Sequence, residues 1–367
     1  MSASSSVTRT AVRPAVQSSW FRDNLGWMAI TVALVALPFV LAILNGQSPA
    51  GVLAGEGGNA KFIQGLMIEI FILGIYAISY DLLLGVTGLL SFGHAMFFAV
   101  GAYFTGIALK SFGWPFPVMV AAVICAGVLQ ALLFGIVLPR VHGVTFALVT
   151  LGFASVFEIA LKSREFADLT GADVGLQGIP KPAFLDPANE RFRFYLVALA
   201  ALMLTYLIYR RFVNSPTGRV AVAIRENEQR ARMLGYNTFY FKLAVLCVSS
   251  IAAALAGMLH ALYMPLVSPH VASLGFTVTA LLMILMGGIG TLSGALLGAA
   301  LFRLMEFYFS RWFGENAAFL IGAVYVLLVL FVPYGIVGTW RRRAAERKTG
   351  LRELARLATG GKVEGKL

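Results

Sequence analysis

Five ionisable side chains stand inside long apolar stretches of the sequence, where a charge is costly and therefore marks a candidate functional position. They are Glu69, Asp81, Glu158, Arg303 and Glu306. Arg303 and Glu306 are three residues apart, so on one face of a helix they can neutralise each other, and we interpret this pair as structural. Glu158 precedes a long polar loop, and we take it as the candidate for contact with a solute.

His94 is a polar residue near the beginning of another apolar stretch, beside Gly93 and three residues after Ser91. An imidazole at membrane depth has to face protein or water rather than lipid. Two interpretations stay open. His94 either lines a pore or gate, or makes a hydrogen bond between helices that sets their packing. A proton relay is less favoured, since no acidic residue lies close to His94 in the sequence.

Sequence patterns of known catalytic sites are absent. The chain has no GxxxxGK[ST] loop for ATP phosphates, no GxSxG elbow and no HExxH helix. Its two cysteines stand in apolar runs and read as small buried side chains. The cysteines and the four scattered histidines are Cys125, Cys247, His94, His142, His260 and His270. We therefore predict no enzyme activity, no metal site and no cofactor bound by this chain.

The most charged internal segment is GRVAVAIRENEQRARMLGYN, from Gly218 to Asn237. A charged helix cannot lie in lipid, so this segment is exposed to water and available to a soluble partner. We predict one continuous helix that ends at Gly235 in a left-handed cap. The alternative is an ordinary solvated loop held by charge pairs such as Glu228 with Arg232.

Composition places the chain in a membrane. Hydrophobic residues make up 59% and charged residues 13% of the 367 residues, whereas soluble domains have roughly 45–50% and 25%. The mean hydropathy of +0.82 agrees. The formal charge of +12 sits in the two tails and one loop, where the positive-inside rule puts it, so the expected neighbour is membrane lipid and not nucleic acid.

The apolar segments predict an all-α polytopic membrane protein with about ten transmembrane helices. A bilayer core of about 30 Å needs about 20 apolar residues in a helix. The predicted spans are 27–44, 62–84, 89–109, 116–138, 143–162, 194–212, 239–263, 273–287, 292–313 and 317–338. The breaks at 84–89 and 287–292 are rich in glycine, and either can hold an interrupted or re-entrant helix.

Three basic regions predict the orientation. They are the tail 1–26, the loop 213–238 and the tail 341–367, and six and then four spans separate them. Both numbers are even, so all three regions lie in the cytoplasm, and residues 27–340 form the transmembrane domain. The loop 163–193 then faces outward. The first span has no convincing cleavage site after it and reads as retained.

The two glycine-rich breaks resemble each other. GVTGLLS at 85–91 is similar to GGIGTLS at 287–293, and each opens a span that runs outward from the cytoplasmic face. Transporters often contain such repeats, with interrupted helices at the transport path. We therefore predict an internal repeat, with chance similarity between short glycine-rich segments as the alternative.

Six blocks of the sequence carry a resemblance to a known family. They are GVTGLLSFGHAMFFAVGAY (85–103), VTFALVTLGF (144–153), GADVGLQGIP (171–180), SPTGRVAVAIRENEQRARMLGYN (215–237), LVSPHVASLGFTVTALLMILMGGIGTLSGALLGA (266–299) and VPYGIVG (332–338). Over about residues 60–340 the chain resembles branched-chain amino acid ABC permeases, and in particular their LivM-like subunit. It departs from the family pattern at Ala172, where a glycine is replaced, and at Arg230, where a small residue is usual.

This resemblance implies a permease subunit of a bacterial inner-membrane importer. Such an importer has a second, LivH-like permease, two cytoplasmic ATPases that use ATP and Mg, and a periplasmic substrate-binding protein. The charged segment is then a coupling helix, packed through Ala223, Ile224, Ala231 and Leu234, that passes motion from an ATPase to the spans. Its candidate coupling residues are Gly218, Arg219, Arg225, Glu226, Glu228, Arg230, Arg232 and Gly235.

The same blocks imply a translocation path beside the glycine breaks. Its candidate residues are Gly88, Ser91, His94, Thr145, Thr150, Glu158, Gly287, Gly290 and Ser293. The resemblance implies a branched-chain amino acid as the solute, and urea, a short amide or another small acid stays open. The residues alone also leave open a secondary carrier driven by an ion gradient, which would need a paired acidic or cation site at mid-membrane.

Overall fold

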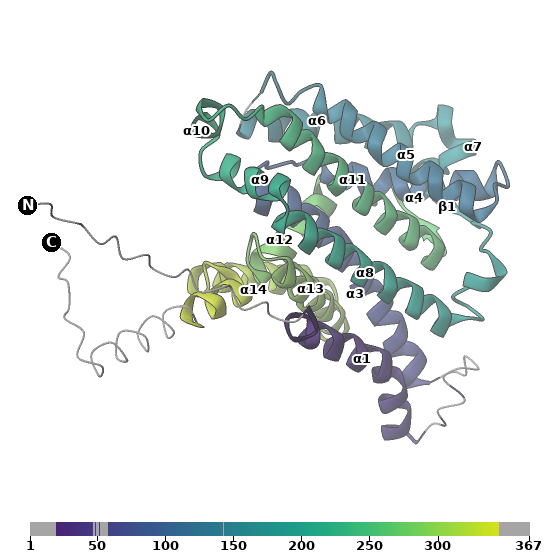
Figure 1. The fold of residues 1–367 in the computed structure, drawn as a ribbon. Helices are drawn as coiled ribbons and strands as arrows, with labels where there is room; N and C mark the ends of the chain where they lie inside the picture. Colours follow the sequence, from purple (N-terminus) through teal and green to yellow (C-terminus); the bar gives the residue numbers. More distant parts are fainter. Residues whose placement is uncertain (1–19, 47, 49–50, 52–57, 142, 345–367) are drawn as a thin grey trace, which may run out of the picture.

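The computed structural model describes residues 20–46, 48, 51, 58–141 and 143–344, and these residues are almost entirely α-helical (Figure 1). The helices are α1 (Trp20–Leu44), α3 (Asn59–Asp81), α4 (His94–Lys110), α5 (Phe116–Gly135), α6 (Val144–Lys162), α7 (Ala167–Thr170), α8 (Arg191–Asn214), α9 (Pro216–Glu226), α10 (Glu228–Met233), α11 (Thr238–Tyr263), α12 (Leu274–Gly287), α13 (Leu292–Phe313) and α14 (Ala317–Phe331). A short antiparallel pair joins β1 (Leu176–Gln177) to β2 (Leu266–Val267). His142 and most of the two predicted tails lie outside the described residues.

The predicted fold class, an all-α polytopic membrane protein, is confirmed. Within the described residues, seven helical stretches are long and apolar enough to cross a membrane. One of these stretches, Leu292–Ala344, contains two predicted spans. The other two predicted spans correspond to α4, with 17 residues, and α12, with 14 residues. At about 1.5 Å per residue α12 is only about 21 Å long, which is less than the roughly 30 Å of a bilayer core.

The first glycine break is longer than the sequence predicted. α3 continues into a π-helical turn, Leu82–Val86, and α4 begins only at His94 and not at residue 89. Gly88 has a φ of +71°, a conformation that residues with a Cβ rarely adopt, and this ends the helix. The second break separates α12 from α13 as predicted. Both breaks are turns between consecutive helices.

The centre of the bundle is formed by α3 and α11. α11 packs against α3, α4 and α5, while α3 also packs against α8 and α13. The approach of α4 to α11 depends on a glycine from each helix. A Cβ on Gly101 would lie 1.9 Å from the Ala254 carbonyl oxygen. A Cβ on Gly257 would lie 1.9 Å from the Phe98 carbonyl oxygen, so the two helices touch through backbone, as small residues allow in lipid.

The charged segment and the long polar loop lie at opposite ends of the bundle. α9 and α10 are at one end, and α7 and β1 are at the other (Figure 1). The loop predicted at 163–193 contains α7, short 3-10 turns and β1. β1 is tied to β2, and the Lys110 ammonium donates a hydrogen bond to the Gln177 carbonyl oxygen at 2.8 Å. A membrane crossed by the long helices would therefore separate α9 and α10 from this loop.

Candidate functional site

α9 starts where the sequence supplies a helix cap. Ser215 Oγ accepts a hydrogen bond from the Gly218 amide at 3.2 Å. Pro216 occupies the first turn, where its missing N–H costs nothing. Gly218, Ala221 and Ile224 form the buried face of the helix. α9 is thus held to the bundle by its apolar side, and its charged side chains are exposed.

The charged segment is two helices, so the prediction of one continuous helix is wrong. Asn227 is extended, with φ −160° and ψ 99°, and separates α9 from α10. Its side-chain oxygen accepts a hydrogen bond from the Arg230 amide at 2.9 Å and caps α10. Asparagine competes with the helix backbone in this way, which explains the interruption. The predicted left-handed end is confirmed, since Gly235 follows α10 with a φ of +88°.

The packing of the charged segment follows the prediction only in part. Ile224 and Ala231 are each 3% exposed, as expected of packing residues. Leu234, however, is 73% exposed, and Ala223 is exposed as well. The change of direction at Asn227 means that one helical repeat does not run through both helices, so the four residues do not share a face. Leu234 is therefore part of the surface that a partner can reach.

Glu228 anchors α10 to the beginning of α11. Its carboxylate binds Arg232 at 2.7 Å and Lys242 at 2.6 Å, and accepts a hydrogen bond from the Thr238 hydroxyl at 3.0 Å. The predicted pair of Glu228 and Arg232 is confirmed. Burial raises the pKa of this carboxyl, but the hydrogen bonds from Lys242 and Arg232 outweigh burial and lower the pKa to about 2. Glu228 and Arg232 thus make contacts within this chain.

Arg225 of α9 reaches both glycine breaks. Its Nη1 donates a hydrogen bond to the Gly85 carbonyl oxygen. Its aliphatic stem covers Gly88, where a Cβ would lie 3.1 Å from Arg225 Cγ. Its Nη1 also lies 3.0 Å from the position that a Cβ on Gly290 would take. One side chain therefore links the charged segment to the two breaks that resemble each other in sequence.

The two breaks also contact each other directly. The Gly290 amide donates a hydrogen bond to Asp81 Oδ1 at 2.6 Å. A Cβ on Gly85 would lie 2.5 Å from the Gly290 nitrogen, so a larger residue would push the breaks apart. In the first turn of α13, Ser293 Oγ accepts a hydrogen bond from Arg341 at 2.9 Å. The similarity of the breaks in sequence thus corresponds to contact in space.

His94 is fully buried between α3 and α4. Its Nε2 is 2.8 Å from Ser79 Oγ, and its ring centroid is 4.8 Å from that of Tyr80. The Tyr80 hydroxyl in turn donates a hydrogen bond to the Ser91 carbonyl oxygen at 3.0 Å. His94 Nδ1 has no hydrogen-bond partner among the described residues. In this structure His94 therefore makes the interhelical contact that was one of its two interpretations.

The remaining predicted path residues do not take part in the contacts of Arg225. Thr145 is exposed at the beginning of α6. Thr150 is buried, and its hydroxyl donates to the Ala147 carbonyl oxygen at 2.8 Å. Glu158 forms an ion pair with Lys162 at 2.8 Å. Gly287 is buried where α12 packs against α13. The structure thus brings Arg225 and the glycine breaks together, and of the α6 residues only Thr150 lies at a break, where a Cβ on Gly93 would be 2.2 Å from the Thr150 carbonyl oxygen.

A charge network that the sequence analysis missed lies along α13. Arg303 binds Glu306 at 2.9 Å, as predicted, and it also binds the carboxylate of Glu69 on α3. The available signal was that both helices carry opposite charges inside apolar runs, where charges usually pair. Only the packing of α3 against α13 brings Glu69 to Arg303.

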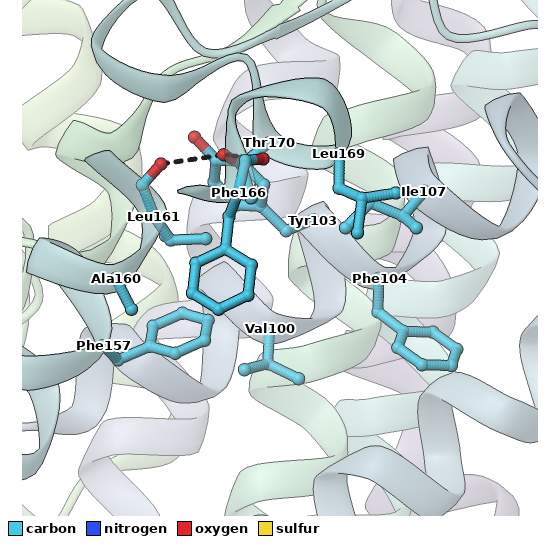
Figure 2. Close-up of a pocket in the computed structure, with 10 residues that line it drawn as sticks. All are labelled: Val100, Tyr103, Phe104, Ile107, Phe157, Ala160, Leu161, Phe166, Leu169 and Thr170. Carbon is cyan, nitrogen blue, oxygen red and sulfur yellow. Dashed lines mark hydrogen bonds between the residues drawn. The ribbon is translucent and has the colours of Figure 1, made fainter. Parts of the chain in front are cut away.

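A cavity of about 290 Å³ between α4, α6 and the turns after α6 is almost wholly apolar (Figure 2). Only two of its lining residues have hydroxyl groups, and both hydroxyls already donate hydrogen bonds. Tyr103 donates to the Val267 carbonyl oxygen at 3.1 Å, and Thr170 donates to that of Leu161 at 2.9 Å. This cavity can hold an apolar group but offers no free donor to a polar solute.

Residues 62–332 match the family described as branched-chain amino acid transport system / permease component. The chain belongs to this family. It is therefore a transport subunit and not an enzyme, as the missing catalytic patterns predicted. Membership also decides against the ion-gradient carrier that the residues alone left open.

The permease is similar to two curated proteins over most of its length. Each is a high-affinity branched-chain amino acid transport system permease protein LivM, one from Escherichia coli and one from Salmonella typhimurium. Each is 27% identical over 350 residues, which cover 89% of this permease and 77% of the relative. The corresponding LivH protein of Escherichia coli is 24% identical over 289 residues, 72% of this permease and 90% of the relative. No solved structure matches the permease.

Proposed function

We propose that this permease is the LivM-like subunit of an ATP-driven importer for branched-chain amino acids or a related small solute. It forms the translocation path together with a second, LivH-like permease. Two cytoplasmic ATPases bind ATP and Mg, and a periplasmic substrate-binding protein delivers the solute. Family membership and the similarity to both LivM and LivH proteins support this assembly.

We place the permease in the bacterial inner membrane, with both termini in the cytoplasm. The ten predicted spans, with the short α12 counted as one of them, lie between the tails 1–26 and 341–367, and the loop 213–238 is cytoplasmic. The even numbers of spans between the basic regions support this orientation. The position of α9 and α10 at the end of the bundle opposite β1 supports it as well (Figure 1).

The coupling role rests on the contacts of Arg225. Its guanidinium binds one glycine break and lies against the other, so a displacement of α9 is transmitted to both turns at once. The exposed charged side chains of the same segment, Arg219, Glu226 and Arg230, form the surface offered to the ATPase. One side of α9 is thus available to the ATPase, and the other side packs against the transmembrane helices.

Reconstitution of the importer with Arg225→Ala tests this role. The ATPase subunits are expected to co-purify as with the wild type, because the exposed charges Arg219, Glu226 and Arg230 are kept. Uptake per ATP hydrolysed is expected to fall several-fold, because the link to the breaks is lost. Arg230→Ala, in contrast, is expected to weaken the association of the ATPase.

Arg140→Ala is the matched control, since Arg140 is an exposed arginine of the α5–α6 loop and, within the described residues, hydrogen-bonds only to the Ile136 carbonyl oxygen, at 3.1 Å. It is expected to leave both association and uptake unchanged. Wild-type uptake and ATPase stimulation by the Arg225→Ala importer would show that the link has no role in coupling.

A further inference from the structure

A buried carboxylate lies where the two glycine breaks meet. Asp81 is the last residue of α3 and is fully buried. Its Oδ1 accepts the hydrogen bond from the Gly290 amide, and a Cβ on Gly85 would lie 2.2 Å from the same oxygen. Its Oδ2 is buried as well and accepts no hydrogen bond from the described residues. One oxygen of the carboxylate thus holds the second break, and the other has no partner.

An oxygen without a partner is unfavourable at such a position. A carboxylate that is removed from water needs an opposite charge or hydrogen bonds to stabilise it. Buried polar atoms of native proteins are therefore nearly always hydrogen-bonded. Asp81 Oδ2 is an exception, and it is free to accept a donor that comes close.

Two arginines lie near this carboxylate, and each binds a neutral group instead. Arg225 and Arg341 are the cations that interact electrostatically with Asp81. Arg225 donates to the Gly85 carbonyl oxygen, and Arg341 donates to Ser293 Oγ at 2.9 Å. Among the described residues, neither guanidinium forms an ion pair with Asp81. A guanidinium binds a carboxylate more strongly than a neutral oxygen, so both arginines have a stronger acceptor nearby.

Of the two arginines, Arg225 belongs to the segment whose exposed side faces the proposed ATPase. Arg341 is tied to the first turn of α13, so it follows the second break. Arg225 Nη1 lies 3.0 Å from the position that a Cβ on Gly290 would take, and Asp81 Oδ1 lies 2.6 Å from the nitrogen of the same glycine. A displacement of α9 or a change of the Arg225 rotamer can therefore carry the guanidinium from the Gly85 carbonyl oxygen to the carboxylate.

We propose that Asp81 is a positioning residue for coupling, the acceptor that receives the Arg225 guanidinium when α9 is displaced. In the present arrangement Arg225 binds the first break, and Asp81 holds the second. In the other arrangement the guanidinium binds both oxygens of the carboxylate, as arginine commonly does. The Gly85 carbonyl oxygen is then released, and the Gly290 amide loses its acceptor. This inference rests on the proposed function, since it names the residue that receives the motion of α9.

Substitutions of Arg225 separate charge from hydrogen bonding and leave the buried carboxylate in place. Arg225→Gln keeps an amide that can donate to the Gly85 carbonyl oxygen but has no charge for Asp81, whereas Arg225→Lys keeps the charge. Uptake per ATP hydrolysed in the reconstituted importer is expected to fall several-fold for Arg225→Gln and to be partly retained by Arg225→Lys. Arg140→Gln is the control, at an exposed position. Equal coupling by the Gln and Lys variants would overturn the proposal.

Asp81→Asn tests the carboxylate itself. Asparagine keeps an oxygen that can accept from the Gly290 amide, but it removes the charge that attracts the guanidinium. Uptake per ATP hydrolysed is expected to fall several-fold. Adding Arg225→Gln is expected to cause no further loss, because each change removes the same ion pair. Normal coupling by Asp81→Asn, or losses that multiply in the double variant, would show that the two residues act separately.

Thiol labelling of the second break follows the exchange without any solute. Ile289→Cys, beside Gly290 and at a position 37% exposed, is made with both native cysteines replaced by serine. Trapping the importer with ATP and vanadate is expected to raise the rate of its reaction with a maleimide several-fold, because the Gly290 amide is released. Arg225→Gln is expected to abolish this rise, and Arg140→Cys, the control, should react equally in both states. An unchanged rate at Ile289→Cys would overturn the proposal.

The possible failures are distinct. If Arg225→Ala uncouples the importer but Asp81→Asn does not, the exchange is refuted and the proposed function stands. No amino acid uptake by the wild-type importer would contradict the proposed function, while the Ile289→Cys rates would still decide whether nucleotide releases the second break.

Discussion

The carboxylate of Glu228 determines how firmly the charged segment is held to the spans. It is the counter-charge of Lys242, whose side chain is only 8% exposed. An ammonium that is this buried is stable only while its partner carries a negative charge. Removal of the Glu228 charge therefore affects α10 and the beginning of α11 together.

Glu228→Gln is expected to lower the stability of the permease at pH 7 by roughly 1–3 kcal/mol, the size of a hydrogen bond to a charged group. The folded-state pKa is about 2, below the ordinary 4.5, so the stabilisation is complete above about pH 4.5 and is lost as the pH falls towards 2. Thermal unfolding in detergent should show the gap between wild type and variant shrinking over this range. Glu226→Gln, at an exposed position, is the control, and a gap that does not depend on pH would contradict the assignment.

At the scale of helices, close packing and interruption have separate causes. α4 and α11 meet through backbone because Gly257 leaves room for the Phe98 carbonyl group. α9 and α10 are separate helices because the extended backbone of Asn227 ends α9, while its side chain caps α10. Each feature depends on one residue type at one position, so each can be tested by a single substitution.

Gly257→Ala is expected to reduce the yield of folded permease sharply, because the new Cβ would lie 1.9 Å from a backbone oxygen of α4. Gly152→Ala is the matched control, since a Cβ there meets nothing within 4 Å. It is expected to be neutral or to stabilise α6 by about 0.5–1 kcal/mol, because alanine is the better helix former. Size-exclusion profiles and unfolding temperatures in detergent measure both. Equal behaviour of the two variants would refute the packing argument.

Asn227→Ala is expected to cost α10 about 1 kcal/mol through the lost cap and to favour one straight helix across the segment. A straight helix would move Met233 and Leu234, which are 76% and 73% exposed, away from their present positions on the partner surface. The expected result is lower uptake per ATP hydrolysed in the reconstituted importer. Asn227→Asp keeps a capping oxygen and should restore coupling. If Asp and Ala behave alike, the cap is not the cause.

At the scale of the whole molecule, the two ends of the bundle have different roles in the proposal. The Arg225 link and the glycine breaks lie near α9, whereas β1 and β2 are at the opposite end.

Single-cysteine labelling tests the orientation. Val174→Cys and Met233→Cys, at positions 64% and 76% exposed, are made in the Cys125→Ser, Cys247→Ser background. An impermeant maleimide is expected to label Val174→Cys in cells whose outer membrane alone is permeabilised. Met233→Cys is expected to react only after the inner membrane is opened. Labelling of Met233→Cys before that step would reverse the topology and remove the ATPase contact.

Much of the site could be predicted from the sequence, and the predictions that failed did so for physical reasons. The similarity of the segments around Gly88 and Gly290 predicted a repeat, and the two segments are in contact. Leu234 was placed wrongly because periodicity was continued through Asn227, a residue that favours caps over helix interiors. Glu69 was not paired because a carboxylate in an apolar run indicates that a partner exists but not which helix carries it.

The amino-acid sequence by itself determined the membrane class, the order of the spans and the exposure of the charged segment between the sixth and seventh of them. Lipid requires long apolar runs to be helical and excludes charge, so these properties are local. Only the tertiary structure decided that Arg225 meets Gly85, that Gly290 meets Asp81 and that Arg303 meets Glu69. These pairs are 140, 209 and 234 residues apart, and their contact depends on which helices pack together. Because the helices are similarly apolar, the sequence of any one helix does not determine which other helix it packs against.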